Sequence, residues 1–142
     1  MSGLASAMAA SASALNVERT RIEVAVSNMA NAESTRSADG QPYRRRDVVL
    51  AADGGNTFDA ALGAASATGV KVAAVVEDSA PFRKRYEPSH PDADADGFVS
   101  LPNVDTPQEM VDMLGAARAY QANLAAIGVI RDMVTKALEL GK

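Results

Sequence analysis

The chain contains no cysteine and no tryptophan, and it has a single histidine in 142 residues. Without cysteine there is no disulfide framework, and no thiolate can bind a metal or act in catalysis. One histidine also removes most metal and nucleophile schemes that need imidazole groups. The formal net charge of −4 argues against nucleic-acid binding, which calls for a basic face. We therefore expect a protein that is not an enzyme and has no cofactor, no metal and no small-molecule substrate.

Bulky side chains are also scarce. Aromatic residues make up only 4% of the chain, although hydrophobic residues reach 47% and 29 residues are alanine. Alanine buries little area, whereas a fully buried Val, Leu, Ile, Phe or Met contributes about 1.5–3 kcal/mol. A monomer of this composition should be thinly stabilised unless other chains cover its apolar surfaces.

The first 17 residues carry no charged side chain, but they do not predict a membrane span. Apart from Met1 and Val17 at the ends, Leu4, Met8 and Leu15 are the only large apolar residues among mostly Ala and Ser. A transmembrane helix needs about 20 predominantly apolar residues. A secretory signal needs a basic start and a dense apolar region, and neither is present. We therefore expect no cleaved signal peptide.

Apolar residues in this N-terminal part recur every seven positions, at Met8, Leu15, Ile22 and Met29. This spacing, lined by small residues, predicts one helix over residues 3–31 with a narrow apolar seam. A seam of that length needs a partner of similar length.

A second long helix is predicted over residues 107–140. Thr106, Pro107 and Glu109 match a capping box with proline in the first turn. The apolar seam of this helix contains Met113, Ala117, Tyr120, Leu124, Ile127, Val134 and Leu138. The two helices lie at opposite ends of the chain and each has a narrow apolar seam. We therefore expect them to pair with each other as an antiparallel coiled coil.

The middle of the chain changes to strand-like patterns at residues 43–50, 70–76, 82–86 and 98–101, with a mobile loop expected over 51–69. The expected fold class is α+β: two long terminal helices and a small β-rich middle region. The expected segments are residues 1–33 for the N-terminal helix, 34–104 for the β-rich region and 105–142 for the C-terminal helix.

Three features of the middle region invite a chemical interpretation. Residues 92–97, DADADG, match the start of a calcium loop, but the twelfth position is Asn103 instead of glutamate. We therefore favour an acidic turn closed by Gly97 and keep a calcium-binding interaction module as the alternative. Arg44, Arg45 and Arg46 should alternate between strand faces, solvated or paired with acidic groups of a neighbouring subunit. His90 has no nucleophile or second ligand nearby in sequence, which favours a structural role.

Several segments together resemble the bacterial flagellar rod and hook family, and most closely its proximal-rod members. These segments are SNMANA at 27–32, ST at 34–35, DGQPYR at 39–44, PSHPDADADGF at 88–98, LPNVDTPQEM at 101–110 and AARAYQAN at 116–123. The resemblance covers both ends and much of the middle, and it leaves residues 51–69 without a counterpart.

The resemblance implies a structural subunit of the periplasmic rod, the shaft that carries motor torque to the hook and filament. It implies terminal helices that line a central export channel, with the β-region outside them. Export would use the flagellar type III apparatus without a cleaved signal. The implied partners are copies of the same chain, other rod proteins, and proteins at the junction of the export gate and the MS ring.

The residues expected to form the assembly interface follow from the seams and from the matched motifs. Met8, Leu15, Ile22, Met29, Met113, Leu124, Ile127, Val134 and Leu138 should pack the helices and their neighbours. Asn28 and Asn31 match the N-terminal motif, and we expect them to bond the helix end and the turn after it. Tyr120, Gln121 and Asn123 match the C-terminal motif and should contact other subunits.

Overall fold

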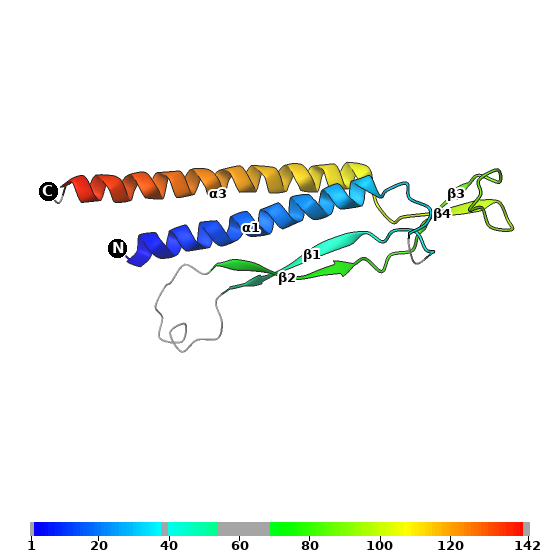
Figure 1. Ribbon diagram of the computed structural model, residues 1–142, viewed down its shortest axis with the longest axis horizontal. Coiled ribbons are helices and arrows are strands. Elements are labelled where there is room, and N and C mark those ends of the chain that lie inside the picture. Colours follow the sequence, from blue (N-terminus) through cyan, green and yellow to red (C-terminus); the bar gives the residue numbers. More distant parts are fainter. Residues whose placement is uncertain (1, 38–39, 54–68, 141–142) are drawn as a thin grey trace. The chain divides into compact units, whose positions relative to one another are not determined.

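The computed structural model describes residues 2–37, 40–53 and 69–140. The element order is α1 (Ser2–Ala30), β1 (Arg46–Ala52), β2 (Val70–Glu77), β3 (Arg83–Tyr86), β4 (Phe98–Leu101) and α3 (Thr106–Leu140), as labelled in Figure 1. The fold class is α+β, as the sequence predicts. Each end of the described chain is one unbroken helix, of 29 residues in α1 and 35 in α3.

Helix α1 ends at Ala30 without a glycine. The Ala32 N–H donates to the Met29 carbonyl (3.2 Å), which tightens the last turn. The Asn31 side-chain amide donates to the Ser27 carbonyl at 2.8 Å. The same carbonyl also accepts the backbone N–H of Asn31 at 3.2 Å, so Asn31 binds the last turn of the helix through both its backbone and its side chain.

Helix α3 begins differently from the predicted capping box. The Glu109 N–H donates to the Asp105 carbonyl at 3.0 Å, which makes Asp105 the capping residue and Thr106 the first residue of the helix. Glu109 lies one position too far along to act as the third-position partner of a box. Its carboxylate is buried and has other partners, described below.

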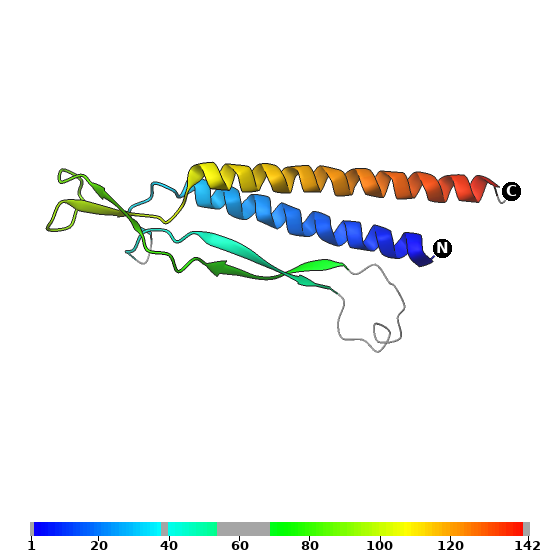
Figure 2. The same ribbon diagram turned by 180° about the vertical axis from the view of Figure 1, so that it is seen from behind.

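Strands β1 and β2 form a two-stranded sheet, which Figure 2 shows from behind. The Asp78 N–H donates to the Arg45 carbonyl at one end, and the Asp53 N–H donates to the Gly69 carbonyl at the other, so the strands are antiparallel. Between these bonds the seven residues of β1 face the eight of β2, which leaves one extra residue in β2. The predicted strands over 43–50 and 70–76 are present with shifted ends.

Strands β3 and β4 form a separate antiparallel hairpin in which Arg83 pairs with Leu101 and Tyr86 with Phe98. The side chains of β4 alternate: Val99 and Leu101 are buried, while Phe98 lies exposed against the ring of Tyr86. This period of two places one face of β4 in the core, whereas all four residues of β3 are exposed. The expected strand over 98–101 is confirmed, and the one expected over 82–86 begins one residue later.

By its internal contacts the chain divides into two compact units, residues 1–20, 49–74 and 115–142, and residues 21–48 and 75–114. Buried apolar residues of the described chain are Val17, Ala25, Ala32, Val99, Leu101, Val104 and Ala116. Three of these are alanine and none is aromatic, so the core is thin, as the composition predicts. Most of it belongs to the second unit.

Two expectations about the arrangement of the chain stay predictions. Pairing of α1 and α3 along their length as a coiled coil stays a prediction, and so does the division into segments 1–33, 34–104 and 105–142. The loop expected over 51–69 lies mostly outside the described residues.

Candidate functional site

The side chain of Asn28, near the end of α1, uses its full hydrogen-bonding capacity. Its Oδ1 accepts hydrogen bonds from the Arg46 N–H and the Tyr43 hydroxyl, both at 2.9 Å. Its Nδ2 donates to the Arg46 carbonyl (2.8 Å) and to Glu109 Oε2 (2.9 Å). Asn28 is fully buried, and these four bonds use both donors and both lone pairs of the amide. Asn28 thus joins α1 to both β1 and α3.

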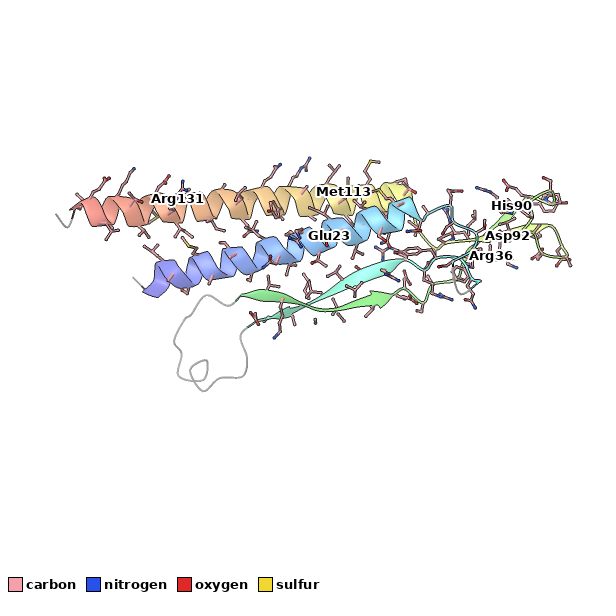
Figure 3. The ribbon with its side chains drawn as sticks, in the orientation of Figure 1. Glu23, Arg36, His90, Asp92, Met113 and Arg131 are labelled. Carbon is pink, nitrogen blue, oxygen red and sulfur yellow. The ribbon has the colours of Figure 1, made fainter. Side chains whose placement is uncertain are left out.

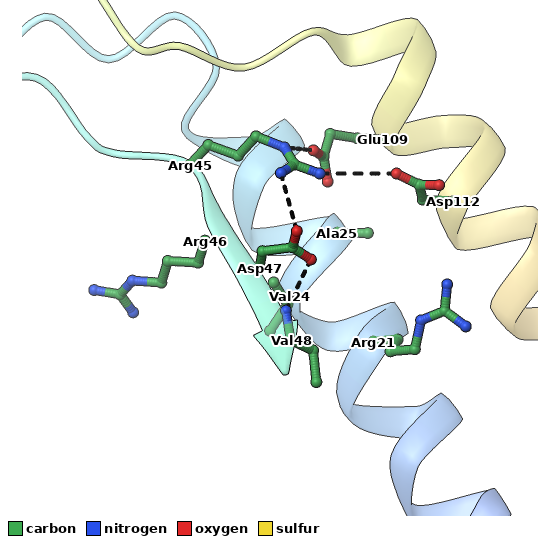
Figure 4. Close-up of a pocket in the computed structure, with 9 residues that line it drawn as sticks. All are labelled: Arg21, Val24, Ala25, Arg45, Arg46, Asp47, Val48, Glu109 and Asp112. Atoms are coloured by element: carbon green, nitrogen blue, oxygen red, sulfur yellow. Dashed lines mark hydrogen bonds and ion pairs between the residues drawn. The ribbon is translucent and has the colours of Figure 1, made fainter. Parts of the chain in front are cut away.

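Glu109 is the buried acid of the same cluster, with 2% of its surface exposed. Arg45 Nε donates to its Oε1 at 2.5 Å, while other nitrogens of Arg45 lie 3.8 Å from Asp112 and 3.5 Å from Asp47 (Figure 4). Burial by itself lowers the pKa of Arg45, but the hydrogen bond and the attraction of Glu109 outweigh it and raise the pKa. Arg45 therefore stays charged at every pH near neutrality.

Beside this pair lies a cavity of about 210 Å³. It is lined by Arg21, Val24, Ala25, Arg45, Arg46, Asp47, Val48, Glu109 and Asp112 (Figure 4). Three cations and three carboxylates balance each other in this lining, which includes no serine or histidine to act as a nucleophile or base. The arrangement holds segments together and does not build an active site. We call the cluster of Asn28, Tyr43, Arg45 and Glu109 the polar joint.

The sequence pointed to parts of the polar joint but assigned them other roles. The position of Glu109, three residues after Thr106, fits a capping box, so the sequence did not indicate that Glu109 is the buried acid of this cluster. Asn28 was expected to bond the helix end, yet its partners are the backbone of β1 and the carboxylate of Glu109. These partners are 18 and 81 positions away along the chain, so no local pattern could identify them.

The three arginines also find partners within the chain. The guanidinium of Arg44 lies over the Phe82 ring at 4.4 Å, and that of Arg46 lies 5.6 Å from the Tyr43 ring. Arg45 pairs with Glu109. The expectation that acidic groups of a neighbouring subunit pair with them is therefore wrong for Arg45, because an internal carboxylate already does so.

Residues 92–97 form an acidic turn in which the carboxylates of Asp92 and Asp94 are already occupied. Asp92 accepts a hydrogen bond from Thr35 at 2.8 Å and pairs with Arg36 at 2.9 Å, and Figure 3 shows Arg36 beside it. Asp94 accepts bonds from the N–H groups of Asp96 and Phe98. Within residues 2–37, 40–53 and 69–140 no three His, Asp or Glu side chains are grouped to hold a metal ion. The calcium alternative gains no support from this geometry.

His90 has a structural contact in the same turn. Its Nδ1 accepts a hydrogen bond from the Asp92 N–H at 3.1 Å. The ring therefore helps to fix the backbone of the turn, in agreement with the role expected from its sequence context.

The seam residues expected at the assembly interface fall into two groups by exposure. Half-buried are Met8, Leu15, Ile22, Met29, Asn31, Met113, Tyr120, Asn123, Ile127 and Val134. Exposed are Gln121, Leu124 and Leu138, the last two at 55% and 59%. Leu124 and Leu138 thus leave apolar surface uncovered on the described chain.

Helix α3 carries a further row of exposed apolar residues that does not belong to the predicted seam. Val111, Val129, Met133 and Leu140 are 52–90% exposed. At 100° per residue they share one face, which lies about 150° around the helix from Leu124. We call Met110, Leu124 and Leu138 the first stripe and these four residues the second stripe. From residue 118 to residue 136, Arg118, Ala125, Asp132 and Lys136 form a mainly polar band between the stripes; Leu114, 48% exposed, lies on the same side one turn earlier.

Comparison with known proteins points to one family. Residues 95–140 match the family model for the C-terminal part of flagellar basal body rod FlgEFG proteins. The flagellar basal-body rod protein FlgC of Salmonella typhimurium strain LT2 is 47% identical over 130 residues, which cover 92% of each chain. FlgC of Bacillus subtilis strain 168 is 43% identical and covers 93% of this chain and 94% of its own. FlgC of Borreliella burgdorferi is 36% identical, with 97% of each chain covered.

The chain belongs to the FlgC family of flagellar basal-body rod proteins. It is accordingly a structural subunit of the bacterial flagellar rod, in a family that is not known to be enzymatic. Membership also implies assembly with other rod components. Neither helix, over its described residues, is both long and apolar enough to cross a membrane.

Proposed function

We propose that this FlgC-family subunit builds the proximal, periplasmic part of the rod and carries motor torque towards the hook and filament. Its terminal helices, paired as an antiparallel coiled coil, would pack against those of neighbouring subunits and enclose the export channel. The β-rich region, residues 34–104, would lie outside this tube.

The observation that carries the proposal is the exposed apolar surface of α3. Its two stripes lie on different sides of one helix and are separated by a polar band, so one partner helix cannot cover both. A helix within a tube has neighbours on two sides, and heterologous contacts of that kind repeat into a helical array. The apolar area left open on the subunit would then be buried in the shaft.

The proposed partners are copies of the same chain, other rod proteins, and proteins at the junction of the export gate and the MS ring. The candidate interface residues include Asn31, Tyr120, Gln121 and Asn123 beside the apolar seams. We also propose export through the type III apparatus without a cleaved signal.

Substitutions in the stripes test this assignment. Leu124→Asp and Met133→Asp each place a charge on an exposed apolar site, one in each stripe, and should leave the fold of the free subunit intact. Burying an unpaired carboxylate between helices costs several kcal/mol, so we expect both variants to lose rod assembly and motility. Swimming assays and electron microscopy of isolated basal bodies measure the outcome.

Ala125→Asp is the matched control, because it adds the same charge at the neighbouring exposed position in the polar band. It shares its face with Asp132 and Lys136, seven and eleven residues further on. We expect Ala125→Asp to swim and to build rods. Normal rods in both stripe variants would contradict the proposal.

A further inference from the structure

The register of β1 against β2 lacks the two features that usually set it. Alternation is weak, because Val49 and Leu50 point to opposite faces and are both more than 40% exposed. Hairpin loops that fix pairing have two to five residues, whereas residues 53–69 separate these strands. No residue of β1 is buried, and a strand without a buried face has a weakly specified register. Something else must therefore hold β1 in place.

Two asparagine side chains hold the start of β1 by its backbone. Asn28 accepts from the Arg46 N–H and donates to the Arg46 carbonyl, as a neighbouring strand would do. Asn103 Oδ1 accepts from the N–H of Arg45, the preceding residue, at 2.9 Å. The Nδ2 of Asn103 also lies 3.4 Å from the Asp78 carbonyl, where β2 has just ended. Together these contacts tie both strand ends to fixed points of the second unit.

The geometry makes these contacts specific for one register. In a strand, the N–H and C=O of one residue point to the same side, and those of the next residue point to the opposite side. A slip of β1 by one residue would therefore turn the N–H and C=O groups at this position away from Asn28. A slip by two residues would bring Val48 to Asn28 and carry Arg45 away from Glu109. Either shift would leave buried polar groups without partners, which is costly.

We infer that Asn28 and Asn103 are the residues that set the register of β1, and with it the single conformation of the β1–β2 sheet. Side-chain amides replace the hydrophobic pattern and the short turn that the sheet lacks. This inference goes beyond the rod role, but it bears on it: a helical array needs identical subunits, and a sheet in mixed registers would present unequal surfaces.

Cysteine trapping can test the register because the chain contains no cysteine. The bond from the Asp78 N–H to the Arg45 carbonyl places Arg46 opposite Glu77, so Arg46→Cys with Glu77→Cys should form a disulfide within the chain. Arg46→Cys with Val76→Cys or with Val75→Cys reports slips of one or two residues. The Arg46 side chain is exposed and only its backbone binds Asn28, so this substitution keeps the contact. Peptide mass spectrometry of the oxidised full-length protein counts each linkage.

We expect the linkage to position 77 to dominate in the parent chain. In Asn28→Ala and in Asn103→Ala the ratio of native to slipped linkage should fall about tenfold or more, which corresponds to the loss of about one net hydrogen bond. Asn123→Ala is the control and should keep the parental ratio, because the side-chain amide of Asn123 donates to the Ala119 carbonyl within α3. Asn103→Ala decides the question if Asn28→Ala does not fold.

An unchanged ratio in Asn103→Ala and in any folded Asn28→Ala would overturn the inference. A fall of the same size in Asn123→Ala would overturn it as well. Because the readout is a linkage within one chain, it is independent of whether the stripe variants assemble rods.

Discussion

At the scale of single residues, the second unit is held together by buried polar groups as well as by apolar ones. Asn28 and Glu109 are both buried, and burying them is tolerable only because each is hydrogen-bonded. Within the described residues no buried side-chain nitrogen or oxygen lacks a partner. Removing one member of such a cluster leaves the others buried without a hydrogen-bond partner. The stability of the subunit should therefore be sensitive to small changes in the polar joint.

Glu109→Gln tests that sensitivity. The substitution keeps the size of the side chain but removes its charge, leaving Arg45 without its closest carboxylate. We expect the free energy of unfolding, measured by urea denaturation of the purified subunit, to fall by about 2 kcal/mol. Because the raised pKa of Arg45 keeps it charged below strongly alkaline pH, the loss should be the same throughout the neutral range.

Glu33→Gln is the matched control. Glu33 pairs with Arg85 at 2.8 Å, but its side chain is 66% exposed and solvent screens the pair. We expect almost no change in stability. Equal losses in the two variants would show that burial of the polar joint has no special weight.

At the scale of elements, the helices and the strands of the second hairpin follow local sequence rules. Seven-residue spacing and high alanine content account for α1 and α3, and alternation accounts for β4. The turn that joins β3 to β4 depends on Gly97, which has φ of +83°. A side chain there would be strained, and its Cβ would lie 3.0 Å from the Tyr86 ring and 3.1 Å from Pro88.

Gly97→Ala should therefore lower the free energy of unfolding by more than the backbone strain alone. Gly40 provides the comparison, because it has φ of +81° but nothing within 4 Å of an added Cβ. We expect Gly40→Ala to cost about 1 kcal/mol and Gly97→Ala about 2 kcal/mol or more. Denaturation of both variants measures the difference. Equal costs would mean that Tyr86 and Pro88 move aside freely.

At the scale of the whole molecule, the chain buries few apolar residues and leaves many exposed. Val111, Val129, Leu138 and Leu140 are all at least 59% exposed in the described chain. Such surfaces are unusual for a soluble monomer and typical of a subunit. Family membership agrees with this composition, since a rod subunit gains burial by joining its neighbours.

The whole-molecule alternative, a calcium-regulated module, makes a different prediction. A calcium loop needs free carboxylates, whereas Asp92 and Asp94 already bind Arg36, Thr35 and backbone N–H groups. We therefore expect a few millimolar calcium to leave the melting temperature of the subunit unchanged, as measured by calorimetry with and without a chelator. A clear calcium-dependent rise would revive the alternative.

The sequence by itself determined the elements and the family. These features depend on composition or on neighbours along the chain: helix and strand periodicity, the thin core and the matched motifs. The predicted helices and strands are present in the structure, with ends shifted by a few residues. The sequence also indicated that apolar seams need partners to cover them. It placed Leu124 and Leu138 in one such seam but did not identify the second stripe.

Tertiary structure decided the polar joint and the placement of β1. Asn28 meets Arg46 and Glu109 only because the chain folds back twice, and the contacts span 18 and 81 positions. By sequence alone, Glu109 fits a capping box, Asn28 fits a bond to the helix end, and Arg45 fits a solvated side chain. Which role each residue takes depends on what burial places beside it, because a buried carboxylate or amide must find its partner wherever the fold supplies one.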